Sequence, residues 1–295
     1  MLGMSVIAVQ PEVTHEPYRP FPVRVARRAR LSPTFVRITL TGEALAGFDY
    51  HGLDQRMSLL FLPAGADHEA FARTPDWTAA WRSGDPSAWA PLRVYTVRAF
   101  RPESLEVDVD IVLHGDGSPA SRWAGAARPG DSIIMISATP GHPVTDVAWR
   151  PPAGANRLLL AADETALPAT ASILESLDCP ATAFIEVPEP DDCLPIAGPA
   201  SVTWLVRSRG ERLEPVVREQ LDRTAPPGAV GDVVEAEDGD VWDVPDEAAG
   251  GFYAWLAGEA GTVTALRRHL VAERGVDRRA IAFMGYWKRG RAQPN

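Results

Sequence analysis

The chain has 295 residues, 45% of them apolar and 23% charged, which is the composition of a globular protein large enough for two domains. A net charge of −10 disfavours nucleic acid as a partner, and the absence of any apolar run long enough to span a bilayer disfavours a membrane. Two cysteines make neither a disulfide framework nor a metal site. With an N-terminus that lacks signal-peptide features, the expectation is a cytoplasmic protein without a bound metal.

Antiparallel β structure is predicted from Phe21 to about Ser137. Strands 21–30 and 34–42 form a pair, a short apolar strand covers 56–62, and residues 63–90 form an excursion with a short helix near 77–81. The remaining strands are 92–98, 105–113 and 132–137. In strand 105–113 the apolar residues alternate with acids, which predicts one buried face and one solvated face. Six strands with hairpin-like connections predict a closed or nearly closed barrel.

The pattern changes after a linker at 149–156, which contains Pro151, Pro152 and Gly154. We therefore expect domains at 15–148 and 155–295. The second domain alternates an apolar strand at 157–162, a helix at 165–177, strands at 181–187 and 202–206, a helix at 211–221, a strand at 252–257, a helix at 262–274 and a strand at 280–286. This alternation predicts a doubly wound α/β fold, with the acidic stretch 231–250 as a loop between its halves.

Strand 92–98 carries three side chains that together suit a flavin. Arg93 offers a planar fork of donors to a phosphate, the ring of Tyr95 can stack on an isoalloxazine, and the Thr96 hydroxyl can bond an edge atom of that ring. An edge strand of any barrel can carry this spacing by chance. Its weight comes from the segment that follows.

Residues 113–123 follow a strand and open a helix. Gly115 and Gly117 let the backbone approach a ligand, and Pro119 suits the first helical position. The free N–H groups of the helix start, with Ser118 and Ser121, form an anion site suited to a pyrophosphate. The segment also fits G-x-G-x-x-A, but the alternating strand before it argues against a Rossmann unit. A Gly-rich turn with an ordinary helix cap is the alternative interpretation.

Two residues of that segment have open roles. His114 can contact the flavin or its phosphates, or it can be satisfied by backbone groups. Trp123 fits a core position better than a site position.

Two strand ends of the second domain suit a nicotinamide nucleotide. Residues 162–168 and 256–259 lie at the carboxyl ends of parallel strands, where open α/β sheets bind ligands. Asp163 and Glu164 can equally cap the following helix. No G-x-G-x-x-G follows Leu160, so this is not the common dinucleotide domain. Arg207 and Arg209, after strand 202–206, are candidates for contact with a 2′-phosphate.

Basic residues gather near the end of the chain. Residues 255–295 hold eight basic side chains against three acidic ones, and 285–291 places two aromatics beside three cations. One interpretation is a lid on the flavin with a basic rim, within a segment 267–291 that attracts an anionic substrate. The other is a solvated helix face and a tail that snorkels over the sheet.

In this order and spacing, the segments 93–98, 114–124, 163–168, 257–259 and 285–288 resemble those of the siderophore-interacting protein family, within the ferredoxin–NADP reductase superfamily. The resemblance covers about Phe21 to Arg291. It implies a Greek-key FAD-binding barrel followed by a nucleotide-binding α/β domain. It also implies reduction of a ferric siderophore with release of Fe(II), using electrons from NADH, NADPH or a ferredoxin. Electron transfer runs through the flavin, so no side chain is expected to be catalytic.

The resemblance and the motif positions together give the expected site. The cofactor-binding residues are Arg93, Tyr95, Thr96, Val97, Asp110, His114, Gly117, Ser118, Pro119, Ala120, Ser121, Trp123, Asp163, Thr165, Ala166, Gly258, Glu259 and Trp287. The substrate-binding residues are Arg56, Lys288, Arg289 and Arg291. Some relatives carry a lysine that meets the siderophore where Ser58 stands here, so the substrate of this chain can differ.

Two other hypotheses stay open at this stage. One is a general NAD(P)H–flavin reductase that feeds another protein and has no siderophore site. The other is a non-catalytic flavoprotein that binds ferric siderophore as a carrier or sensor.

Overall fold

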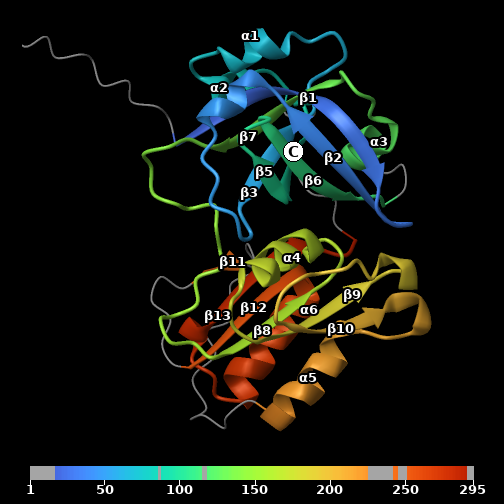
Figure 1. Ribbon diagram of the computed structural model, residues 1–295, viewed down its shortest axis with the longest axis vertical. Coiled ribbons are helices and arrows are strands. Elements are labelled where there is room, and N and C mark those ends of the chain that lie inside the picture. The colour runs from blue at the N-terminus through green and yellow to red at the C-terminus, as the bar shows by residue number, and fades with distance from the viewer. Residues whose placement is uncertain (1–16, 86–87, 115–117, 225–241, 245–250, 291–295) are drawn as a thin grey trace, which may run out of the picture.

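The computed structural model describes residues 17–85, 88–114, 118–224, 242–244 and 251–290. It contains two sheets, one from each half of the chain, and the first lies above the second in Figure 1. Within these residues no helix is both long and apolar enough to cross a membrane. The domain boundaries 15–148 and 155–295 stay a prediction.

The first sheet is antiparallel and has the strand order β4-β3-β7-β1-β2-β6-β5. Its strands are β1 (Tyr18–Arg30), β2 (Phe35–Thr41), β3 (Arg56–Leu60), β4 (Leu92–Thr96), β5 (Ala99–Arg101), β6 (Glu106–Val112) and β7 (Ser132–Ala138). The chain passes from edge strand β4 to the opposite edge strand β5 through only Val97 and Arg98, so the sheet must curl until its edges meet. A nearly closed barrel was therefore the right prediction.

Two short elements, β5 (Ala99–Arg101) and helix α1 (His68–Ala72), were not predicted from the sequence. β5 has only three residues, and helix α1 has five, which is too short for a period to show. Helix α2 (Trp77–Trp81) lies where a helix was expected, and helix α3 (Pro119–Ala126) begins at the expected proline.

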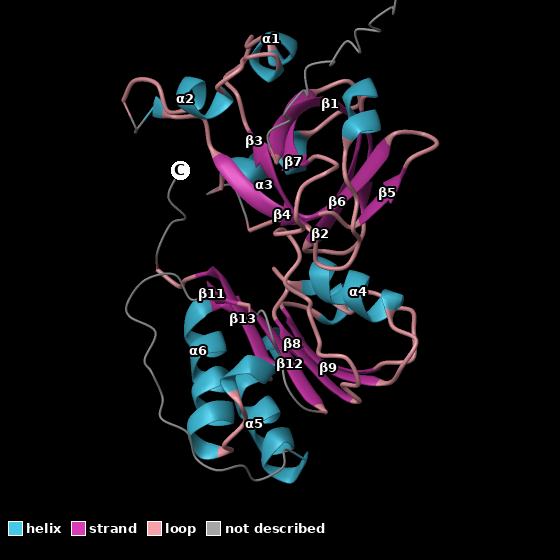
Figure 2. Cartoon of the chain, turned by 90° about the vertical axis from the view of Figure 1, so that its left-hand side faces the viewer, coloured by secondary structure: helices cyan, strands magenta, loops and turns pink. Residues whose placement is uncertain are grey.

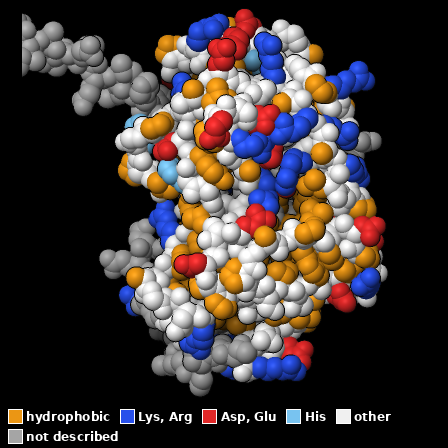
Figure 3. All heavy atoms as spheres, in the orientation of Figure 1, with side chains coloured by type: hydrophobic (Ala, Val, Ile, Leu, Met, Phe, Trp, Pro, Cys, Tyr) orange, Lys and Arg blue, Asp and Glu red, His pale blue; other side chains and the backbone are white. Residues whose placement is uncertain are grey.

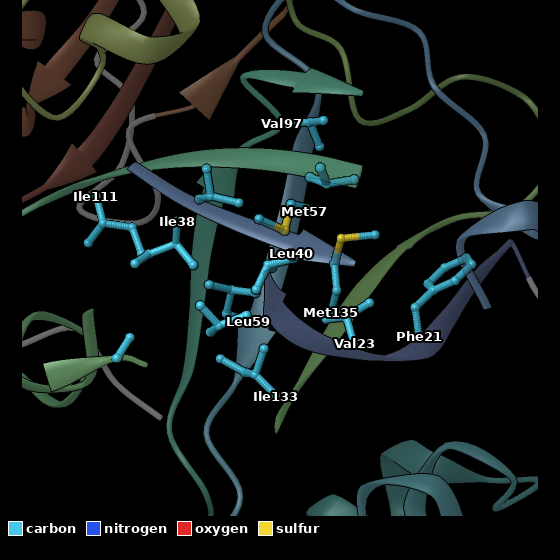
Figure 4. Close-up of a cluster of buried hydrophobic side chains, with 14 of the residues drawn as sticks. Phe21, Val23, Ile38, Leu40, Met57, Leu59, Val97, Ile111, Ile133 and Met135 are labelled. Carbon is cyan, nitrogen blue, oxygen red and sulfur yellow. The ribbon is translucent and has the colours of Figure 1, made fainter. Parts of the chain in front are cut away.

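The core of the barrel is built by inward-facing side chains of its strands. Figure 4 shows them converging from β1, β2, β3, β6 and β7: Phe21, Val23, Ile38, Leu40, Met57, Leu59, Ile111, Ile133 and Met135. Val97, from the link between β4 and β5, joins them and is fully buried. Burial of this apolar cluster positions β4, which carries the flavin-like motif, against β3.

The acidic face of β6 is not solvated, which corrects the expectation of a half-buried strand. Asp108 and Asp110 are only 5% and 7% exposed. Arg101 donates two hydrogen bonds of 2.8 Å to Asp108, and Arg37 donates bonds of 2.7 and 2.8 Å to Asp110. Figure 3 shows arginines interleaved with acidic side chains over β1, β2 and β6. The polar half of the alternation faces this guanidinium layer instead of water.

The second sheet has the strand order β10-β9-β8-β12-β13-β11. Its strands are β8 (Arg157–Ala162), β9 (Ala181–Val187), β10 (Ser201–Val206), β11 (Trp242–Asp243), β12 (Phe252–Glu259) and β13 (Ile281–Trp287). All neighbours are parallel except β11, which pairs antiparallel with β13 inside a stretch expected to be a loop. The rest of residues 231–250 lies outside the described residues.

Helices cover both faces of this sheet, as a doubly wound fold requires. Figure 2 shows α4 (Leu167–Ser176) on one face and α5 (Leu213–Thr224) with α6 (Ala260–Arg268) on the other. The helix expected over 262–274 ends at Arg268 and continues as a single π-helical turn, His269–Glu273.

Buried carboxylates join the two sheets. Asp54, before β3, is 1% exposed and accepts hydrogen bonds from the backbone of Ala148 and Trp149 and from Nε1 of Trp255 on β12. On the other side of α4, the fully buried Asp192 accepts bonds from residues of the β1–β2 turn. These contacts tie the segment before β3 and the β1–β2 turn of the barrel to the second half of the chain.

Candidate functional site

Adjacent strands β8 and β12 form the switch point of the second sheet, because their following helices lie on opposite faces. Asp163 follows β8, and Glu259 ends β12. The Oδ2 atom of Asp163 accepts hydrogen bonds from the backbone N–H of Glu259 at 2.8 Å and from Nε1 of Trp287 at 2.7 Å. Its Oδ1 accepts from the Thr165 backbone and hydroxyl at 2.9 and 2.5 Å. Four residues predicted from separate segments are therefore in direct contact.

Gly258 is required by the same arrangement. Its φ is +142°, and a Cβ built on it would lie 2.6 Å from the carboxyl carbon and Oδ2 of Asp163. No side chain can occupy that space, so only glycine lets β12 approach the carboxylate this closely.

Burial, reinforced by the charge of Glu164, raises the pKa of Asp163 to about 6, although hydrogen bonds from Thr165 and Trp287 oppose the shift. An acid whose pKa is higher in the folded state binds its proton more tightly there. The free energy of unfolding therefore falls as pH rises between about 4 and 6, by up to about 3 kcal/mol from this group.

That loss is measurable as a difference between two proteins. In urea titrations from pH 4 to 7, we expect the stability of wild type relative to Asp163→Asn to decline across this window, because the asparagine does not titrate. The comparison cancels the other carboxylates. A constant difference from pH 4 to 7 would contradict the prediction.

Glu164 forms a second buried cluster beside the first. It is 2% exposed, and Arg207 donates to both its carboxylate oxygens while donating from Nε to Glu186 at 2.7 Å. The guanidinium of Arg207 is thus held by two carboxylates of its own domain. This corrects the idea that Arg207 meets a 2′-phosphate; Arg209 is exposed and is not so held.

On the barrel side, β4 presents the expected motif. Arg93 is half-buried, and its guanidinium donates to the carbonyl of Leu92 at 2.8 Å. Tyr95 packs against the barrel core, and burial raises the pKa of its hydroxyl. The hydroxyl of Thr96, 7% exposed, has no hydrogen-bond partner within the described chain. Val97 differs from Arg93, Tyr95 and Thr96. Its side chain lies in the core, and its N–H donates to the carbonyl of Gln55.

Helix α3 has the features of an anion site. Its N-cap, Ser118, makes no side-chain cap, Pro119 is in the first turn, and that turn holds no acidic residue. The Oγ of Ser121 accepts from the N–H of His114 at 3.0 Å, and Ala120 is buried. Gly117 lies outside the described residues.

The other residues predicted near α3 lie in different surroundings. Trp123 packs edge-on against Phe61, with ring centroids 5.6 Å apart, as a core residue does. Asp110 lines a cavity of about 140 Å³ between the barrel and α4, together with Arg37 and Arg98. Ala166 is fully buried. Its N–H donates to the carbonyl of Asp163 and its carbonyl accepts from the N–H of Thr170, so both of its backbone groups are hydrogen-bonded within the protein.

The two domains meet across His114. Partial burial lowers the pKa of His114, a shift that the nearby charge of Glu164 opposes and that of Arg207 reinforces. Both charges belong to the carboxyl edge of the second sheet. His114, which follows β6, is therefore within the electrostatic influence of residues of the second sheet.

A second contact runs through Arg56, which pairs with Thr96 between β3 and β4. Its guanidinium lies 4.3 Å from the centre of the Trp242 ring, and Trp242 stacks on Tyr286 with planes 12° apart. The contact of Trp242 was not predicted from the sequence. The available signal was that Trp242 is the one aromatic residue in the acidic stretch 231–250. Arg56 therefore contacts the second sheet through Trp242 and Tyr286, the residue that precedes Trp287.

The basic end of the chain is split by the fold. Lys288 and Arg289 are exposed just after β13, at the carboxyl edge, whereas Arg291 lies outside the described residues. Arg279 precedes β13 and pairs with Asp277, a strand length of roughly 23 Å away from Lys288. The segment 267–291 therefore does not form one basic surface at the site.

The fold is ferredoxin-reductase-like. It combines a curled antiparallel first sheet with a second sheet whose switch point lies between β8 and β12. A ferredoxin reductase of carbazole 1,9a-dioxygenase shares it at 15% identity, with a TM-score of 0.61 over 95% of this chain and 74% of that chain. The model of the siderophore-interacting FAD-binding domain matches residues 24–142, and that of the siderophore-interacting protein matches residues 155–290. The chain belongs to the siderophore-interacting protein family, and its first domain is the FAD-binding domain of that family.

Several relatives are similar over nearly their whole length. Ferric vibriobactin reductase ViuB of Vibrio cholerae is 31% identical, over 90% of this chain and 88% of its own. The siderophore-interacting protein SipS of Aeromonas hydrophila is 29% identical with a TM-score of 0.67, over 94% of each chain. A siderophore utilization protein of T. fusca is 27% identical with a TM-score of 0.68, over 94% of this chain and 95% of that chain.

Proposed function

We propose that this protein is an FAD-dependent ferric-siderophore reductase that takes electrons from NAD(P)H. The supporting observation is the meeting of two sites at one junction. The flavin-suited strand β4 is paired with β3, whose Arg56 contacts the Trp242–Tyr286 stack beside Trp287. Trp287 in turn bonds Asp163 at the switch point. A hydride donor on the second sheet and a flavin on the barrel would therefore be neighbours.

The residues present fit FAD by their chemistry. The Arg93 fork and the uncapped first turn of α3 would hold the phosphates, Tyr95 would stack on the ring, and the unpartnered Thr96 hydroxyl would bond its edge. When bound, FAD supplies the conversion of one hydride into two single electrons. The balance is one NAD(P)H and two Fe(III) complexes giving NAD(P)⁺, a proton and two Fe(II).

The carboxyl edge of the second sheet is the place for the nicotinamide nucleotide. Thr165, Gly258, Glu259 and Trp287 lie there around Asp163, each next to its carboxylate. Because Arg207 is held by Glu164 and Glu186, any contact with a 2′-phosphate would fall to Arg209. A ferredoxin as alternative donor stays a prediction.

The exposed Lys288 and Arg289 would attract an anionic ferric complex to the rim of this junction. The iron arrives held by its siderophore, so the protein needs no ligands of its own for it. ViuB, named for reduction of ferric vibriobactin, supports this substrate class for a relative of nearly equal length.

An anaerobic visible spectrum tests the proposal. We expect flavin bands in the FAD-loaded protein that bleach with NADH or NADPH and return when a ferric siderophore is added, with Fe(II) trapped by a chelator. Bands that never bleach with either nucleotide would point to another donor or to a carrier. Equal rates with ferricyanide and with siderophores would indicate a general flavin reductase. No flavin binding at all would remove the proposal.

A further inference from the structure

The carboxylate of Asp163 connects segments that lie far apart in the chain. Its two oxygens accept four hydrogen bonds, from Thr165 on its own turn, from the backbone of Glu259 and from the indole of Trp287. The side chain is 5% exposed, and every one of these donors is a neutral N–H or O–H group. The oxygens are thus fully used within the protein, so Asp163 offers little to a nucleotide directly.

The same point is braced from β12. A register shift between Gly258 and Glu259 brings Glu259 opposite Trp287 on β13. The Glu259 carboxylate then accepts from the N–H of Arg289 at 3.1 Å and from the N–H of Thr262 at 2.9 Å. Two acids, one on each strand end, therefore fix the chain that leaves β13.

From this geometry, and resting on the proposed function, we infer that Asp163 is a positioning residue: it holds the indole of Trp287, and with it residues 285–290, in place at the flavin–nicotinamide junction. Asp163 acts through the Trp287 Nε1–H and the Glu259 N–H, without touching the nucleotide. The close approach of Gly258 supports this role, because a Cβ built on Gly258 would lie only 2.6 Å from the carboxyl carbon of Asp163.

Hydrogen exchange on the full-length protein without FAD measures the contact directly. Asp163→Ala removes the acceptor, and Trp287→Phe keeps the ring but removes the donor. We expect either change to speed amide exchange in residues 284–290 about tenfold, as loss of a charge-assisted hydrogen bond does. The double variant should exchange no faster than the faster single one, because both changes break the same bond.

A matched control is Asp277→Asn, which alters an exposed carboxylate at the other end of β13 and should leave residues 284–290 as in wild type. If Asp163→Ala does not fold, Trp287→Phe decides the outcome alone. Wild-type exchange in Trp287→Phe, or additive effects in the double variant, would overturn the inference.

Flavin circular dichroism separates positioning from a purely structural contact. With FAD bound, Asp163→Ala and Trp287→Phe should change the visible band in the same way, while Asp277→Asn should not. Faster exchange with an unchanged flavin band would mean that Asp163 is structural only, and would overturn the positioning role. If wild type binds no FAD, the proposed function fails and the positioning role with it, while the exchange data still report whether the contact exists.

Discussion

Asp192→Ala should lower the free energy of unfolding by about 3 kcal/mol, the largest stability effect we expect in this chain. Asp192 is fully buried and accepts hydrogen bonds from the Ser32 hydroxyl at 2.6 Å and from the Thr34 N–H and hydroxyl at 3.0 and 2.7 Å. It also accepts from the N–H of Glu189. Alanine would leave four buried donors without this acceptor. Urea unfolding followed by circular dichroism gives the value.

The neighbouring Asp191 offers the control, since it lies on the same 3-10 turn, Pro190–Asp192, but is exposed. Asp191→Ala should change stability by less than about 0.5 kcal/mol. Because Asp192 joins the domains, its loss should also make the linker 149–156 more sensitive to protease. Equal stability of the two variants would show that the junction does not depend on this carboxylate.

Arg93→Ala should weaken FAD binding by roughly 10- to 150-fold, which corresponds to the loss of a charged hydrogen-bonding partner. Among the described residues the guanidinium has one acceptor, the carbonyl of Leu92, so its other donors are available to a phosphate. Arg93→Lys should fall between, since it keeps the charge but not the fork. Quenching of FAD fluorescence on titration measures each dissociation constant.

Arg73→Ala is the matched control for that titration. It removes the same charge from a side chain that is 71% exposed and, in the part of the chain that the structure describes, pairs with Glu69 of α1 alone. Its FAD affinity should equal that of wild type. If Arg73→Ala and Arg93→Ala weaken FAD to the same degree, the effect is one of net charge and β4 does not hold a phosphate.

Most elements could be predicted from the sequence because their patterns are local. β8 and β9 match their predicted ranges, and β10, β12 and β13 begin and end within two residues of theirs. What could not be predicted depends on residues distant in the chain. Asp192 meets Ser32 across 160 residues, and nothing near either position marks the pair.

The contacts within the candidate site could be predicted less well than the segments that form it. Asp163, Gly258, Glu259 and Trp287 were all expected near a nucleotide, and the structure brings them together. The use of both Asp163 oxygens within the protein could not be predicted from the sequence, because two of the four donors come from other strands, β12 and β13. The prediction that the acidic face of β6 is solvated was wrong for a similar reason. Alternation of apolar and acidic residues along a strand does not show whether the acids face solvent or a layer of arginines.

The fit between Gly258 and Asp163 limits which substitutions this protein can accept. A side chain at position 258 would clash with the Asp163 carboxylate and would also have to adopt a φ of +142°, so this position is restricted to glycine while Asp163 is in place. Design of a different nucleotide preference would therefore have to leave this pair untouched and work on the Glu164, Arg207 and Glu186 cluster, where exchanging one charge releases another.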